Sequence, residues 1–330
     1  MTSSARPAWQ RWIIRHLFVY LAVIAGASVL VSILVAREDL QAAIRGFSPS
    51  LAAVVLGLPV LNYSLRFIKW DRLLADSSIH IDRVSSAWIY FACLAMVVTP
   101  ARLGELYKLV FLRRLHGIGP ARSLPPLILE RATDVLALLA LCTAQLVSGP
   151  LRAAAVAGAA ILMIAFGALL ASPATRRPIL SMLTALPGLR SRSSRIAELV
   201  DGHARLLVPS SLGPNLVLSI LAWWAECVGL WLICRGLGSA PGIGDATWIY
   251  SASTLLGNLT FLPGGLGGTE FALKTLLEGA GVIAAVALPA TLLIRAATLW
   301  FAVFLGLTVT MLGRRRLRWS EVREEAAAGD

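Results

Sequence analysis

The sequence lacks the residue patterns of the common enzyme and metal-protein classes. It has no P-loop, no G-x-S-x-G nucleophile motif, no H-E-x-x-H motif and no Asp-rich metal motif. The four His residues are scattered and give no metal-ligand spacing. We therefore predict no catalytic residue, no metal ligand and no cofactor.

Cysteine is also scarce. The four Cys residues lie in apolar segments and form no C-x-x-C pair, so we interpret them as small packing residues.

Acidic residues are outnumbered by basic ones, 18 to 30, and the net charge is +12. The basic residues lie in short loops between apolar runs, which argues against nucleic-acid binding. The positive-inside bias of membrane proteins explains most of the excess, and attraction to anionic lipid headgroups is compatible with it. Hydrophobic residues make up 57% of the chain and the mean hydropathy is +0.75, which predicts an integral membrane protein.

Run lengths and loop charges predict an all-α polytopic protein with six full transmembrane helices and two re-entrant helical hairpins. The full spans are expected at 17–36, 51–70, 123–148, 151–171, 213–236 and 287–312. Basic flanks place both termini in the cytoplasm and the protein in the cytoplasmic (inner) membrane. Lys69, near the end of the second span, is expected to snorkel to the interface, whereas Arg66 lies deeper.

Two hinges interrupt apolar segments and organise this topology. The first, 99–105, contains Pro100 and Gly104. The second, 262–270, contains Pro263 and the glycines Gly264, Gly265, Gly267 and Gly268. The hinges align as P-x-x-L-G, Trp-Ile-Tyr precedes each of them, and Arg-Ala follows each, at offsets of about 160 residues. We therefore interpret the chain as two inverted repeats.

The predicted organisation is a single membrane domain, 1–330. It has a first repeat, 51–148, with a re-entrant hairpin at 84–115; a basic cytoplasmic linker, 173–207; and a second repeat, 213–312, with a re-entrant hairpin at 247–279.

Charged residues beside the hinges form the candidate site. A charge at the centre of a membrane helix costs about 2.5–3.5 kcal/mol on insertion scales, so these residues must be paired or hydrated. In the pairing hypothesis, Arg131 and Arg295 bind nearby acids and fix each hairpin to the following span. In the cavity hypothesis, the same groups converge near the midplane and line a polar cavity for a lipid headgroup; one Arg can serve both. The candidate substrate-binding residues are Arg102, Glu105, Tyr107, Lys108, Arg131, Asp134, Glu226, Glu270 and Arg295.

Three motifs resemble a known family: R-x-G-E at 102–105, R-x-x-D at 131–134 and L-P-G-G-x-G-x-x-E at 262–270. In this order they are similar to the flippase-like, lysylphosphatidylglycerol synthase transmembrane-region family, over nearly the whole chain. The resemblance implies a stand-alone member that handles membrane lipids, with a headgroup in a central cavity and no soluble aminoacyltransferase domain. A flippase or transporter is the favoured interpretation. The alternative is a membrane enzyme or an accessory subunit of lipid, glycolipid or hopanoid biosynthesis.

Overall fold

The computed structural model describes residues 47–99, 104–146, 198–199, 201–202, 205–239, 241–260, 262–314 and 316–317. The spans predicted at 17–36 and 151–171, most of the linker at 173–207, and the residues Pro100 and Arg102 lie outside the described residues. The described part of the chain is helical and contains no β-strand.

The first half contributes α3 (Pro49–Asp76), α4 (Arg83–Cys93), the 3₁₀ turn η1 (Leu94–Met96), α5 (Tyr107–His116) and α6 (Pro120–Leu146). The second half contributes α10 (Pro209–Gly236), α11 (Ile243–Leu259), the 3₁₀ turn η4 (Pro263–Gly265), α12 (Gly268–Gly279), α13 (Ala284–Arg295), the π-helical turn η5 (Ala296–Trp300) and α14 (Phe301–Leu312). The predicted helices at 51–70, 213–236, 268–279 and 287–312 correspond to α3, α10, α12 and the continuous helix α13–η5–α14.

Three of the described helices are long and apolar enough to cross a membrane: α3, α10 and the helix at Ala284–Leu312. The helix α6 is nearly as long as α3, at 27 residues, but it carries three charged side chains at 130–134. For the described residues, the predicted all-helical fold with apolar spans is therefore confirmed.

Local sequence explains where several helices begin and end. The hydroxyl of Ser48 accepts a hydrogen bond from the amide of Leu51, and Pro49 occupies the first position of α3. The carboxylate of Asp82 caps α4 by accepting from the amide of Ser85 at 2.8 Å. Gly117 ends α5 with a left-handed φ of 67°, a conformation that glycine adopts without a steric penalty.

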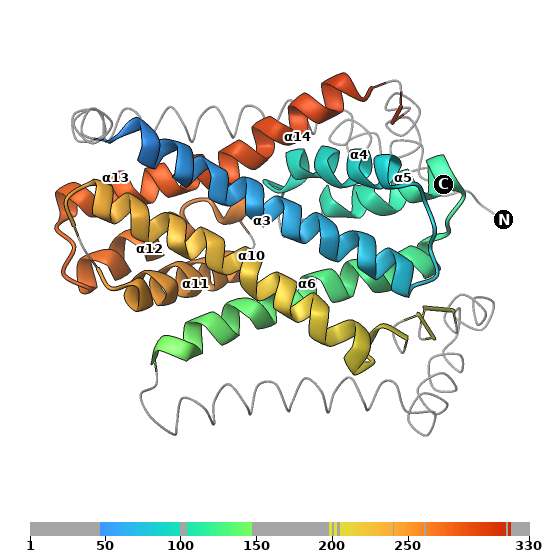
Figure 1. Cartoon of the computed structure of the whole chain (residues 1–330), viewed down its shortest axis with the longest axis horizontal. Coiled ribbons are helices and arrows are strands. Elements are labelled where there is room, and N and C mark those ends of the chain that lie inside the picture. Colours follow the sequence, from blue (N-terminus) through green and yellow to red (C-terminus); the bar gives the residue numbers. More distant parts are fainter. Residues whose placement is uncertain are drawn as a thin grey trace, which may run out of the picture.

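The two central helices, α3 and α10, make the most extensive helix pairing in the described part of the chain. The pair α4 and α5 and the pair α11 and α12 lie at opposite ends of the long axis (Figure 1). The helix after each pair packs on the pair of the other half: α6 contacts α11, and α14 contacts α4 and η1. Gly306 permits the second contact, because a Cβ there would collide with the backbone of Ala95.

Candidate functional site

A network of buried charges links α3, the first hinge, α5 and α6. We call it the α3–α6 network. Its members are Arg66, Lys69, Glu105, Lys108, Glu130, Arg131 and Asp134.

Asp134 is the acid of the network with the most cationic partners. Its Oδ2 lies 3.0 Å from the guanidinium of Arg66 and 3.1 Å from that of Arg131. Its Oδ1 accepts from the ammonium of Lys69 and, at 3.1 Å, from the hydroxyl of Ser219 on α10. Three cations therefore surround one carboxylate, in contacts that reach across three helices.

Glu130 holds the second part of the network. Both of its carboxylate oxygens accept from the Nζ of Lys108, at 3.0 and 2.8 Å, and its Oε1 also accepts from Arg131 at 2.7 Å. The Nζ of Lys108 lies 4.5 Å from the ring centroid of Trp70 and 4.7 Å from that of Tyr90. The ammonium is thus held by a carboxylate and by two aromatic faces, both of which stabilise a desolvated cation.

Glu105 connects this network to the first hinge. Its Oε1 accepts from Arg131 at 3.0 Å, and its side chain is only 7% exposed. The hydroxyl of Thr99 donates to the carbonyl of Met96 and accepts from the amide of Gly104, both at 2.7 Å. A side chain at Gly104 would clash with Met96, so glycine is required at this position of the hinge.

Burial explains why these charges occur together. Lys69 and Glu130 are fully buried, and Lys108, Asp134, Glu105 and Arg66 are between 3% and 7% exposed. Removal of one partner from such a pair leaves an uncompensated buried charge, which is strongly destabilising. The seven members carry four positive and three negative charges, so the network has a net charge of +1.

The second hinge is held by a smaller set of contacts. Arg295 donates to Oε1 of Glu270 at 2.6 Å and to the carbonyl of Gly264 at 2.7 Å. The other carboxylate oxygen of Glu270 accepts from the amide of Gly267 at 2.7 Å and so caps the start of α12. Arg295 therefore contacts both sides of the glycine-rich turn.

The glycines of this hinge adopt the conformations that their residue type suggests. Gly264, Gly265 and Gly267 have φ of 60°, 67° and 82°. Gly268 is helical, but a Cβ there would clash with Thr260. Pro263 begins the 3₁₀ turn η4.

The two halves thus contain the same kind of ion pair. An acid at the end of each hinge, Glu105 or Glu270, binds an arginine 26 or 25 residues later, Arg131 or Arg295. The structure contains both contacts that the pairing hypothesis requires. Within the described residues, no hydrogen bond or ion pair joins the Glu270–Arg295 pair to the α3–α6 network. A single site at the midplane therefore stays a prediction.

The remaining candidates lie in different surroundings. Glu226, on α10, accepts from the hydroxyl of Tyr250 at 2.6 Å. Tyr107 is half-buried and packs against two clusters of the hydrophobic core. Arg102 lies outside the described residues.

The structure also adds residues that the sequence analysis missed. The snorkelling predicted for Lys69 is wrong, because its ammonium is fully buried and pairs with Asp134. Lys69 follows Arg66 by three residues on an apolar helix, so the two cations share one face, and that spacing is the signal for a common acidic partner. No sequence signal marks Trp70 and Tyr90 as neighbours of Lys108.

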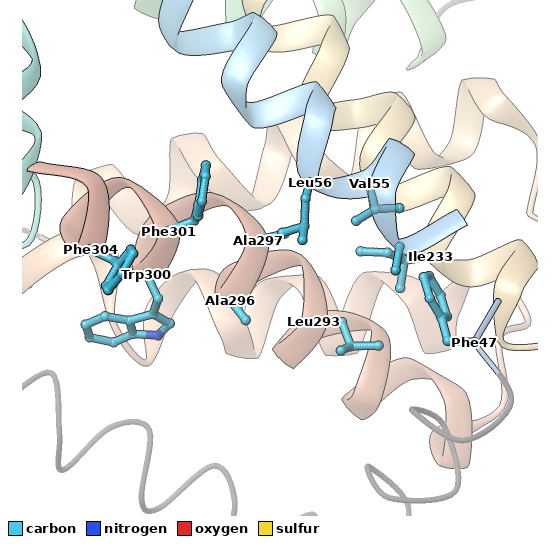
Figure 2. Close-up of a pocket in the computed structure, with 11 residues that line it drawn as sticks. Phe47, Val55, Leu56, Ile233, Leu293, Ala296, Ala297, Trp300, Phe301 and Phe304 are labelled. Carbon is cyan, nitrogen blue, oxygen red and sulfur yellow. The ribbon is translucent and has the colours of Figure 1, made fainter. Parts of the chain in front are cut away.

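An apolar groove of about 530 Å³ lies between α3, α10 and the α13–α14 helix. Figure 2 shows side chains from these helices and Phe47 surrounding it. It is lined by Phe47, Ala52, Val55, Leu56, Ile233, Leu293, Ala296, Ala297, Trp300, Phe301 and Phe304. Ala296, Ala297 and Trp300 belong to the π-helical turn, whose wider turn shapes one wall of the groove.

Comparison with known proteins places the chain in a family. The profile of the lysylphosphatidylglycerol synthase TM region matches residues 17–306. The chain belongs to this family. A curated relative, a UPF0104 membrane protein of Methanothermobacter thermautotrophicus, is 32% identical over 97 residues. That alignment spans 29% of this chain and 29% of the relative. These matches and the apolar helices make the chain an integral membrane protein.

Proposed function

We propose that this chain moves a phospholipid or a related polar lipid across the cytoplasmic membrane. The observation that carries the proposal is the partly buried pair formed by a hinge acid and an arginine in each half, Glu105–Arg131 and Glu270–Arg295. Each pair attaches a break in an apolar segment to a helix that follows it. At membrane depth, such irregular backbone is tolerated only if it is buried in protein or lines a cavity. Family membership supports a membrane lipid as the substrate class.

The proposed architecture has six spans and two re-entrant hairpins in inverted repeats. It is supported by the reciprocal packing of α6 on α11 and of α14 on α4, because elements related by a two-fold axis exchange equivalent contacts. In transporters of this design, the substrate binds at the interface between repeats, and movement of one repeat against the other alternates its access.

The proposed substrate contacts divide by polarity. The headgroup meets the candidate charged residues, of which Arg131 has the most exposed side chain in the α3–α6 network, at 27%. The apolar groove has the chemistry of an acyl-chain contact, because only the indole N–H of Trp300 is a polar group among its side chains.

The basic end of α5 supports the proposed orientation. Its last turn carries Arg113, Arg114 and His116, and Arg122 follows on α6. We place this end at the cytoplasmic surface, with both termini on the same side, where basic residues are attracted to anionic lipids.

Reconstitution of the purified chain in liposomes tests the transport proposal. A fluorescent phospholipid in both leaflets is exposed to a membrane-impermeant quencher, and the protected fraction is followed with time. Faster loss of protection without chemical change of the lipid supports transport. A chemically altered lipid with no faster exchange would instead support the enzyme alternative.

Cysteine labelling tests the inverted topology. Leu262 is the first residue of the second hinge and is 47% exposed, so Leu262→Cys is preferred to a change at a glycine of positive φ. Leu262→Cys and Ala101→Cys are made separately in a background without the native cysteines. A membrane-impermeant thiol reagent should label one position from one side of the membrane and the other position from the opposite side. Reaction of both positions from one side would contradict the inverted repeats.

A further inference from the structure

The α3–α6 network and the aromatic residues beside it contain more hydrogen-bond donors than acceptors. Four buried donor groups have no acceptor among the described residues: Arg66 Nε, Trp70 Nε1, the Tyr90 hydroxyl and Arg131 Nε. Trp70 and Tyr90 are at most 1% exposed, and Arg66 is 7% exposed. Buried donors of this kind are rare in folded proteins, because desolvation without a partner costs stability.

The four donor groups belong to side chains that are connected through shared contacts. Arg66 and Arg131 bind the same oxygen, Oδ2 of Asp134. Lys108 and Arg131 bind the same oxygen, Oε1 of Glu130. Because the ammonium of Lys108 lies within 4.7 Å of the ring centroids of Trp70 and Tyr90, these aromatic side chains adjoin the same charged centre.

The acceptors already present are largely in use. Both oxygens of Glu130 and both of Asp134 accept hydrogen bonds, and Oε2 of Glu105 is the one carboxylate oxygen of the described network without a partner. The network also carries one positive charge more than its acids neutralise. It is short of both acceptor atoms and negative charge.

We propose that this part of the protein binds an anionic phosphate group, with Arg66, Trp70, Tyr90 and Arg131 as donors. A phosphate offers several strong acceptor oxygens and supplies the missing negative charge, and guanidinium groups bind it with two parallel hydrogen bonds. The ligand reaches the network at Arg131, whose side chain is 27% exposed. The phosphate of a lipid headgroup and free phosphate share this chemistry. The lipid assignment rests on the proposed transport function, whereas the phosphate site does not.

Binding to the purified full-length chain in detergent tests the site. The probes are inorganic phosphate, a short-chain phosphatidylglycerol and a short-chain diacylglycerol, which lacks phosphate. Each is titrated by microscale thermophoresis, and the Tm of each protein variant is measured without ligand. The test variants are Tyr90→Phe, which removes the hydroxyl and keeps the ring, and Trp70→Phe, which replaces the indole N–H donor and leaves a smaller aromatic ring beside Lys108.

Two control variants separate binding from folding. Tyr63→Phe removes a hydroxyl that donates to the carbonyl of Thr298 at 2.6 Å, so it should lower the Tm without changing phosphate affinity. Trp224→Phe changes an indole that is 45% exposed on α10 and should change neither quantity. Tyr90→Phe should keep or raise the ligand-free Tm, because its hydroxyl has no acceptor among the described residues.

We expect phosphatidylglycerol to bind and diacylglycerol not to bind, with Kd raised roughly tenfold in Tyr90→Phe, as loss of a hydrogen bond to a charged group predicts. If inorganic phosphate competes, the site takes phosphate from either source; if it does not, the site takes the lipid headgroup. Equal binding of diacylglycerol, or unchanged affinity in both test variants, would overturn the site. Phosphate binding without lipid exchange in liposomes would leave the site standing and refute the transport function.

Discussion

The two hinges contain the same kind of ion pair but, among the residues that the structure describes, they adjoin different numbers of charged contacts. At the first, Arg131 binds Glu105, Glu130 and Asp134. Glu130 also binds Lys108, and Asp134 also binds Arg66 and Lys69. At the second, Arg295 binds one acid, Glu270, and one backbone carbonyl. The second turn also contains three residues of positive φ, all of them glycine.

This difference indicates which hinge moves at lower cost. Because Arg131 also binds Glu130 and Asp134, a change at the first hinge that moves Arg131 disturbs three ion pairs, two of them to buried acids that keep other cations in place. A change at the second breaks one charge-assisted pair and one hydrogen bond to a carbonyl, and its glycines tolerate new backbone angles. In the transport cycle that we propose, we therefore infer that the first half is the fixed part and the second hinge the moving part.

Removal of the central acid of the first network should have the largest effect. Asp134→Asn leaves Arg66, Lys69 and Arg131 with one counter-charge fewer, and we expect a loss of about 3–5 kcal/mol in the free energy of unfolding. Glu270→Gln, the matched change at the second hinge, should cost less, because an amide oxygen still caps Gly267. Thermal unfolding in detergent compares the two. An equal or larger loss for Glu270→Gln would contradict the difference between the hinges.

A side chain at Gly265 should be the next most damaging change. Its φ of 67° and a Cβ position 2.6 Å from Oγ1 of Thr269 disfavour any other residue. Gly265→Val should destabilise by at least about 1–2 kcal/mol, the penalty of the left-handed conformation alone, and should slow lipid exchange. The control is Gly57→Ala, at an exposed helical site with open space, which should be neutral or slightly stabilising. Wild-type Tm and exchange in Gly265→Val would refute this prediction.

Replacement of each hinge arginine by lysine sharpens the comparison. Lysine keeps the charge but loses the planar fork that lets Arg131 bind three carboxylates. Arg131→Lys should fold with a Tm lower than that of Arg295→Lys and should exchange lipid slowly. Circular dichroism melts and the liposome assay measure both properties. The prediction fails if Arg295→Lys is the less stable protein.

Removal of a partly exposed ion pair outside both hinges should have the smallest effect on stability. Lys274 and Glu278 pair at 2.7 Å along α12, with side chains 41% and 32% exposed. Lys274→Ala should change stability by no more than about 0.5 kcal/mol and leave exchange unchanged. A larger loss in melting experiments would show that α12 as a whole is sensitive to substitution.

Several features of the fold could be predicted from the sequence, because apolar run length and glycine-proline breaks act locally. The end of α10, both boundaries of α12 and the positive φ in the second hinge follow from such patterns, whereas α10 begins at Pro209, four residues before the predicted start. The repeat alignment also indicated that Arg131 and Arg295 have equivalent roles. The depth of Lys69 could not be predicted, because an interfacial lysine and a paired buried one have the same neighbours in sequence. Only the packing of α3 against α6 and α10 distinguishes them.

The π-helical turn after Arg295 sets the rotational phase of the last helix. It takes in one residue more than an α-helical turn, so the faces of α13 and α14 are offset by about 100° relative to an unbroken helix. With that offset, one face of the helix places Arg295 against Glu270, and another face packs Gly306 against the backbone of Ala95. Deletion of a single residue from 296–300 would restore a regular helix and satisfy only one of these contacts. The extra residue thus rotates α14 relative to α13, so that one continuous helix contacts the second hinge and also packs on the first half of the protein.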